Sequence, residues 1–251
     1  MLNDTCFENG WVPNMRLDIV EQNMILDFHN KLRSDVAVGK YICQNNLLLD
    51  TATDMYYLEH DVQLTYIASV WIRNCWEENP KCIDVDRFKV GMNHVFHFRS
   101  NKTEMDALHD ILELWENECR SFRRMNVSDY SGSQNFSQVQ NFTQMIWGNT
   151  TKIGCARAVF HLPPAETFEY HEFGSTDYNY WLVCLYGTKC CESKTIYDIG
   201  PICKKCSSKT DCLFGLCKRR IAGSSKHNAG IALPMILVFW FLFDISLWKH
   251  S

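Results

Sequence analysis

Apolar side chains recur every three or four residues in three stretches of the chain, and this spacing predicts three amphipathic helices. In the first stretch the apolar stripe runs from Leu17 to Leu32, and Gly39 is suited to ending the helix. Before the third stretch, Asn101 or Thr103 can cap the first turn. The expected helices cover residues 16–38, 51–73 and 104–123.

Three further stretches have the composition of strands, since they alternate loosely or are rich in β-branched and aromatic residues. They cover residues 92–98, 152–160 and 178–186. The strands sit too close in the sequence for helical crossovers, which favours antiparallel pairing. We therefore expect an α+β domain in which a mostly antiparallel sheet lies between helical layers.

The composition of the chain changes after Gly187, where cysteines become frequent. Six cysteines fall within residues 190–217, a segment too small to be held by hydrophobic burial, so disulfides are expected to stabilise it. The run 231–248 is apolar and near the lower length limit of a membrane-spanning helix. Small residues at 222–225 precede it, as in a glycolipid-anchor signal, so both kinds of membrane anchor stay open. The predicted divisions are an N-terminal segment (1–15), the body (16–189), the cysteine-rich segment (190–217), a linker (218–230) and the tail (231–248).

Cysteines and glycosylation motifs together indicate the compartment. The 251 residues include 13 cysteines and six Asn-x-Ser/Thr sequons, two independent features that favour the secretory pathway. The first residues lack the pattern of a signal peptide, so we expect the leader to lie upstream of Met1. The sequon at Asn141 begins a stretch expected to be buried, so no glycan is expected there. Glycans are expected at Asn3, Asn101, Asn126, Asn135 and Asn149.

Four groups of residues match the signatures of one family. The stretch 141–150 (NFTQMIWGNT) resembles H-[FY]-T-Q-x-[VI]-W-x-x-T, and 180–186 (YWLVCLY) resembles a signature with the core V-C-N-Y. The other matches are His29-Asn30-x-x-Arg33 to H-N-x-x-R and, to the insect antigen 5 pattern, Cys75 and Cys82 with Arg87-Phe88 and Gly91-Met92-Asn93. Over residues 16–203 the chain thus resembles the CAP superfamily of cysteine-rich secretory proteins, antigen 5 and pathogenesis-related proteins. The resemblance implies an α-β-α sandwich, with the body 16–189 as its SCP domain.

The resemblance also points to a cleft that has lost most of its metal ligands. Family members with the complete site place two His and two Glu there, side chains that suit zinc. The corresponding positions in this chain are Asn79, Met92, Glu118 and Asn141. One carboxylate with two amides and a thioether is a poor transition-metal site and has no base that titrates near neutral pH. We therefore expect no metal, no other cofactor and no catalytic residue.

Some of the cysteines can be assigned to pairs. Cys155 and Cys184 lie on neighbouring predicted strands and form one expected disulfide. The resemblance to cysteine-rich secretory proteins implies Cys203 with Cys212 and Cys206 with Cys217. Antigen 5 relatives tie the N-terminal segment to the helix region, which implies Cys6 with Cys75 or Cys82. The cysteines left unassigned are Cys43, Cys119, Cys190 and Cys191.

The sequence argues against two classes of function. With 25 Lys and Arg against 29 Asp and Glu, the chain carries a net charge of −4, so no basic excess is present to neutralise nucleic-acid phosphates. A nucleophile motif such as G-x-S-x-G does not occur, which argues against a hydrolase. Four tryptophans could line a ligand groove, but core positions are favoured for Trp71, Trp115, Trp147 and Trp181.

The resulting interpretation is a non-enzymatic, exported protein held at the cell surface by its tail. The resemblance implies extracellular recognition, with a sterol or another lipid as cargo, because family members carry such ligands. The alternative is a secreted protein ligand or ion-channel modulator that acts through the cysteine-rich segment. Its partner would be an extracellular protein or a lipid, and the sequence names neither.

Overall fold

The computed structural model describes residues 17–43, 46–74, 83–122, 127, 138–161, 178–190 and 195–220, with the backbone alone at positions 97, 99, 160 and 161. The chain divides into two units, Met1–Arg220 and Ile221–Ser251. All described residues belong to the first unit, so the predicted tail (231–248) lies outside them. Within the described ranges, no helix is long and apolar enough to cross a membrane.

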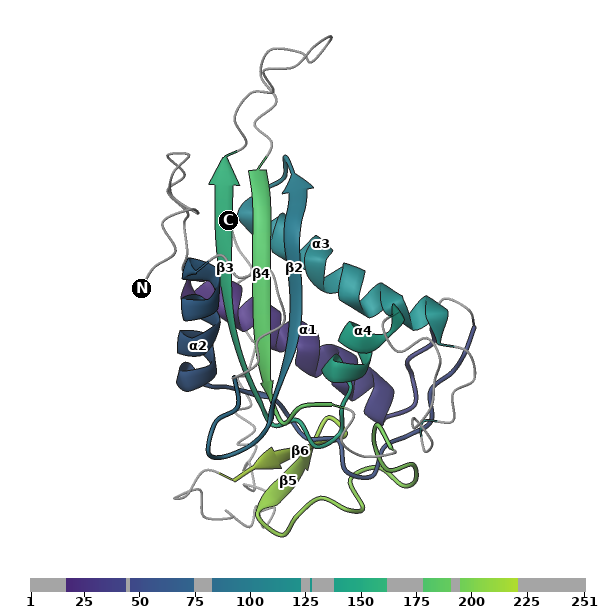
Figure 1. The fold of residues 1–251 in the computed structure, drawn as a ribbon. Coiled ribbons are helices and arrows are strands. Elements are labelled where there is room, and N and C mark those ends of the chain that lie inside the picture. The colour runs from purple at the N-terminus through teal and green to yellow at the C-terminus, as the bar shows by residue number, and fades with distance from the viewer. Residues whose placement is uncertain are drawn as a thin grey trace, which may run out of the picture. The chain divides into compact units, whose positions relative to one another are not determined.

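The helices and strands follow one another as Figure 1 shows. The helices of the described part are α1 (Ile19–Ala37), α2 (Val62–Arg73), α3 (Glu104–Asn117) and α4 (Gln140–Met145), and a 3-10 helix (Glu118–Ser121) follows α3. The strands are β1 (Glu59–His60), β2 (Val90–Ser100), β3 (Lys152–His161), β4 (Tyr178–Gly187), β5 (Thr210–Leu213) and β6 (Leu216–Arg219).

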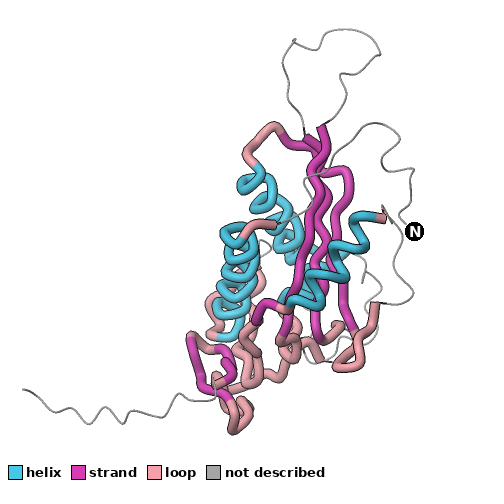
Figure 2. The backbone as a smooth tube through the Cα atoms, turned by 90° about the vertical axis from the view of Figure 1, so that its left-hand side faces the viewer, coloured by secondary structure: helices cyan, strands magenta, loops and turns pink. Residues whose placement is uncertain are grey.

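Four strands form the central sheet in the order β1-β3-β4-β2. β4 is antiparallel to both β3 and β2, whereas the short β1 pairs with β3 in parallel. α2 covers one face of the sheet, and α1, α3 and α4 cover the other (Figure 2). The structure therefore confirms the expected α-β-α sandwich with a mostly antiparallel sheet.

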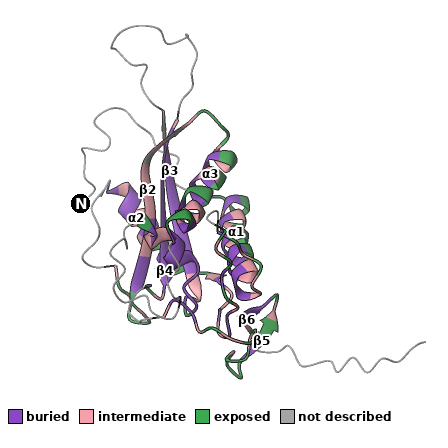
Figure 3. Ribbon diagram, turned by 90° about the vertical axis from the view of Figure 1, so that its right-hand side faces the viewer, coloured by how far each residue is buried: buried purple, intermediate pink, exposed green. Residues whose placement is uncertain are grey.

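The central strand β4 is apolar at successive positions because both of its faces are covered. Trp181, Val183 and Leu185 pack with α2, whereas Leu182 and Cys184 pack with the opposite helical layer. Strands β3 and β4 are accordingly buried between the layers, whereas much of the edge strand β2 is intermediate, as Figure 3 shows by colour. A strand enclosed in this way does not alternate between polar and apolar residues.

Side chains that precede the three longer helices fix where these begin. Asp18, Asp61 and Thr103 each accept a hydrogen bond from the backbone N–H three residues later, at 2.8, 3.0 and 3.2 Å. Such bonds satisfy N–H groups that have no partner within the helix. Of the two caps expected for the third helix, the structure uses Thr103.

The expected helix 51–73 was wrong in its first half, because α2 begins only at Val62. The segment before Asp61 bonds to distant parts of the chain instead. Thr53 N donates to Asp198 O at 2.8 Å, and Tyr56 N donates to Gly148 O at 3.0 Å. The apolar spacing that suggested a helix reflects the burial of this irregular segment in the core. The expected helix 104–123 also ends early, at Asn117, where the 3-10 helix takes over.

Disulfides join elements within the unit. Cys155 and Cys184 lie opposite each other on β3 and β4 and are bonded, as expected. Cys43 bonds to Cys119, a pair that was not predicted, and Cys190 is also disulfide-bonded. The two pairs implied by the resemblance, Cys203–Cys212 and Cys206–Cys217, are present. The remaining candidates, Cys6, Cys75 and Cys82, lie outside the described residues.

Candidate functional site

Glu118 stands at the start of the 3-10 helix, and its carboxylate caps the start of α4. Oε1 accepts a hydrogen bond from Asn141 Nδ2 at 2.6 Å. Oε2 accepts from the backbone N–H groups of Asn141 and Phe142 at 2.8 and 3.0 Å. Burial raises the pKa of Glu118, and these three hydrogen bonds oppose the rise. Oε2 therefore caps the helix, which a carboxylate does well at its positive end, while Oε1 holds the Asn141 side chain.

The other predicted cleft positions do not all meet at Glu118. Met92 lies on β2 opposite Leu185 and packs with the cluster on the α2 face of the sheet. Its neighbour Asn93 points the other way, where it is fully buried and donates from Nδ2 to Asn141 O at 3.0 Å. Asn79 lies outside the described residues. The structure thus brings Glu118 and Asn141 together and adds Asn93, which the motif match did not assign to the cleft.

A chain of buried polar groups continues from Asn93 into α1. Asn93 Nδ2 lies 3.3 Å from Tyr186 Oη, which in turn lies 2.8 Å from His29 Nε2. His29 Nδ1 lies 2.7 Å from the carbonyl oxygen of Ile25. Because a carbonyl only accepts, Nδ1 carries the proton and the Tyr186 hydroxyl donates to Nε2. Burial lowers the pKa of His29 to about 4, so the imidazole is neutral and engaged at both nitrogens.

Arg33, one helical turn after His29, fastens α1 to the segment that leaves α4. Its guanidinium is fully buried and donates to five backbone carbonyls at distances between 2.8 and 3.1 Å. Burial lowers the pKa of Arg33 to about 9, so the group stays a cation at neutral pH. The accepting residues are Tyr56, Met145, Trp147, Gly148 and Thr150.

Two more signature residues also bind backbone. Asn30 Nδ2 donates to Leu58 O at 3.0 Å and its Oδ1 accepts from Leu58 N at 2.8 Å. Gln144 Nε2 donates to Thr188 O at 3.2 Å, and its Oε1 accepts from Cys190 N at 2.8 Å. The signature residues therefore hold irregular segments in place, which is a structural role.

A second group of polar side chains lies on the exposed part of α3. Within the described ranges, His109, Asp110 and Glu113 form the group of His, Cys, Asp or Glu side chains whose ligand atoms lie within 4.8 Å of one another. Lys102 Nζ already lies 2.6 Å from Asp110 Oδ2. This cluster is an ion-paired surface group distinct from the cleft.

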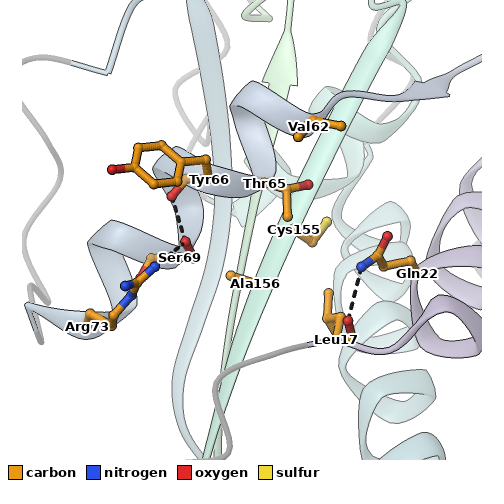
Figure 4. Close-up of a pocket in the computed structure, with 9 residues that line it drawn as sticks. All are labelled: Leu17, Gln22, Val62, Thr65, Tyr66, Ser69, Arg73, Cys155 and Ala156. Atoms are coloured by element: carbon orange, nitrogen blue, oxygen red, sulfur yellow. Dashed lines mark hydrogen bonds between the residues drawn. The ribbon is translucent and has the colours of Figure 1, made fainter.

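A groove of about 460 Å³ lies between the start of α1, the length of α2 and strand β3 (Figure 4). Leu17, Val62, Tyr66 and Ala156 give it an apolar lining, and Arg73 stands at one end. Arg73 Nη2 donates to Ser69 Oγ at 3.1 Å. The four tryptophans considered earlier do not contribute to this groove, and each exposes 6% of its surface or less, which confirms their core positions.

The sequons fall on different kinds of surface. Asn101 and Asn149 are exposed. At Asn141 the amide nitrogen that a glycan would modify is bonded to Glu118. Asn3, Asn126 and Asn135 lie outside the described residues.

Comparison with known proteins identifies the family. The sequence model of CAP, the Cysteine-rich secretory protein family, matches residues 26–186. The chain belongs to this family. Venom allergen 3 of Solenopsis invicta is 33% identical to this CAP protein over 175 residues, which cover 69% of the chain and 70% of that relative. Venom allergen 5 2 of Polybia paulista is 31% identical over 168 residues, or 66% of the chain and 73% of the relative.

Solved structures show the same fold. The crystal structure of NaASP2 with Zn²⁺ is 25% identical, with a TM-score of 0.60, and covers 80% of this CAP protein and 96% of that chain. The structure of BmVAL-1 is 23% identical, with a TM-score of 0.62, over 82% and 97% of the two chains. The fold of the family is thus retained over most of the described unit.

The cleft residues that the structure describes do not fit a zinc ion. Both carboxylate oxygens of Glu118 are occupied by N–H donors, and the side-chain nitrogen of Asn141 is one of these donors. Met92 belongs to the opposite face of the sheet. A zinc site needs three or four lone pairs that converge on one point. The side chains of Glu118 and Asn141 are instead hydrogen-bonded to each other and to the backbone.

Proposed function

We propose that this CAP protein is an exported, non-enzymatic recognition protein whose cleft is a structural part of the fold. The observation that carries the proposal is the Glu118 carboxylate, which accepts three N–H groups from the start of α4. The imidazole of His29, the base that joins this network, is buried and neutral with both nitrogens engaged. General acid–base catalysis needs a group that reaches a substrate proton, and this network supplies none.

A small apolar ligand is the form of recognition that the groove beside α2 supports. Its volume of about 460 Å³ and its apolar lining resemble those of small-molecule sites in general. Arg73 at one end offers a cation to a polar head group. We therefore propose a sterol or a related lipid as cargo, carried by a protein that its tail holds at the cell surface.

The alternative is a protein ligand or channel modulator that acts through the cysteine-rich segment. Exposed side chains in that segment, such as Phe214 and Ile202, support this alternative. The two roles make different predictions for lipid uptake, because only the first needs the groove.

An extraction assay with labelled sterol distinguishes the two roles. We expect the protein to extract the sterol from vesicles, and Val62→Asp to reduce the extraction about tenfold, because it places a charge on the groove wall. Val62 is 75% exposed and opens α2, where Asp is well tolerated, so the variant should fold normally. Leu114→Gln, which changes an exposed residue of α3, is the matched control. Saturable binding to cells without any sterol uptake would reject the cargo role and support the ligand role.

A further inference from the structure

The cysteine-rich end of the domain is basic although the whole chain is acidic. Residues 195–220 contain six Lys or Arg and two Asp, whereas the net charge of the chain is −4. The two Asp are already paired, Asp198 with Lys205 at 2.5 Å and Asp211 with Arg220 at 2.8 Å. Exposed cations that have no carboxylate partner among the described residues are Lys204, Lys209 and Arg219. This end therefore presents a positive surface.

The turn of the β5–β6 hairpin carries a large exposed apolar residue. Phe214 exposes 77% of its surface, and its φ of 50° precedes a φ of 81° at Gly215. Two successive residues with positive φ form the turn that suits a two-residue hairpin, where Asn and Gly are preferred and bulky residues are unfavourable. Neither the backbone conformation nor packing accounts for a phenylalanine at this position.

A second apolar side chain lies beside this turn. Ile202 is 44% exposed, and its Cγ2 is 3.6 Å from the place where a Cβ on Gly215 would lie. Phe214 and Ile202 together form an apolar tip. Lys204 follows Ile202 by two residues, whereas Lys209 and Arg219 lie at the other end of the hairpin, where Thr210 pairs with Arg219.

The tip is held firmly against the body of the domain. Ser34 Oγ donates to Phe214 O at 2.6 Å, and Cys217 N donates to Met55 O at 2.8 Å. The disulfides Cys203–Cys212 and Cys206–Cys217 fix the rest of the segment. The exposed ring is therefore part of a preorganised surface, and binding through it costs little conformational entropy.

We propose that this hairpin docks on an anionic lipid surface, with Phe214 and Ile202 in the interface and the unpaired cations on lipid phosphates. Aromatic side chains flanked by Lys and Arg suit the boundary between head groups and acyl chains. A sulfated polysaccharide would use the cations alone and would leave the apolar tip without a role. Ten residues, 221–230, separate Arg220 from the apolar run 231–248, and ten extended residues span at most about 36 Å. A membrane that engages that run lies within reach of the hairpin.

Co-sedimentation with vesicles tests this docking in a chain that ends at Ser225, which removes the apolar run from the measurement. The last cysteine is Cys217, the hydrogen bonds given above lie within residues 17–220, and Ile221–Ser251 forms a separate unit, so the shortened chain keeps the whole described fold. We expect it to bind vesicles of phosphatidylcholine with phosphatidylserine, to bind phosphatidylcholine alone weakly, and to lose binding as salt is raised.

Two variants separate the apolar tip from the charges. Phe214→Asn should lower the partition onto the mixed vesicles about tenfold, and Asn favours positive φ, so the hairpin should fold at least as well. The triple change Lys204→Gln, Lys209→Gln and Arg219→Gln should lower it about a hundredfold, since each cation near an anionic surface contributes several-fold. Leu114→Gln, on α3, is the control and should leave the partition unchanged.

The proposal fails if Phe214→Asn binds the mixed vesicles as well as the unchanged protein does. It also fails if the protein binds heparin but neither kind of vesicle, because the partner would then be a polyanion without an apolar phase. Equal binding to both kinds of vesicle would likewise contradict the role assigned to the cations.

Discussion

His29 links the stability of the fold to pH, because its imidazole is buried, neutral and bonded at both nitrogens. Burial lowers its pKa to about 4, whereas the pKa in the unfolded chain is about 6.5. The unfolded chain therefore binds the proton first as the pH falls. The contribution of neutral His29 to the free energy of unfolding is complete above about pH 6.5. It falls by about 3 kcal/mol as the pH is lowered to 4.

Urea unfolding with the disulfides intact measures this effect. The difference in stability between the unchanged protein and His29→Gln should shrink by about 3 kcal/mol from neutral pH to pH 4. His60→Gln changes an exposed imidazole and should keep the pH dependence of the unchanged protein. A difference that stays constant with pH would show that His29 is not held in its neutral form.

At the scale of elements, α4 depends on a cap that comes from elsewhere in the chain. The helix has six residues, too few to be stable alone, and Glu118, 23 residues before Asn141, bonds its first N–H groups. Glu118→Ala should therefore lower the free energy of unfolding by about 2 kcal/mol, and Glu118→Gln, which keeps one acceptor oxygen, by about 1 kcal/mol.

Chemical unfolding of three variants checks the capping role. Glu113→Ala removes an exposed carboxylate of α3 and should change the stability by less than about 0.5 kcal/mol. If Glu118→Ala is as stable as the unchanged protein, the carboxylate is not needed as a cap and would be available to a ligand.

Elements whose signals are local were predictable from the sequence, and those that depend on distant residues were not. The apolar run of β4 and the cap Thr103 of α3 lie within the elements or next to them. By contrast, α4 is capped by Glu118 across the fold, and the segment before α2 is held by bonds to residues 148 and 198. The β5–β6 hairpin was not predicted, because its turn has Phe214 at a position where Asn is usual.

The candidate site was predictable in part for the same reason. Motif matching placed Glu118 and Asn141 in one cleft, and the structure joins them by a hydrogen bond. It also assigned Met92 to that cleft, although Met92 packs on the α2 face. The alternation of strand side chains would have indicated Asn93 instead, once the face toward α4 was known. Which face of β2 lies toward α4 depends on how the helices pack against the sheet, and a sequence motif does not indicate this.

Across the whole molecule, this CAP protein keeps the fold of its family. His29, Asn30, Arg33 and Gln144 still bind backbone segments together. The Glu118 carboxylate accepts hydrogen bonds at the start of α4, and the side-chain amide of Asn141 is one of the donors. We therefore expect that the cleft is held by hydrogen bonds and does not take up a divalent cation.

Calorimetric titration of the full chain with zinc tests this claim most directly. His109→Ala removes the imidazole of the surface cluster on α3, so that any zinc bound there is not attributed to the cleft. We expect the His109→Ala chain and the His109→Ala, Glu118→Gln chain to take up the same amount of zinc. Binding of one equivalent of zinc by the His109→Ala chain, abolished by Glu118→Gln, would contradict it.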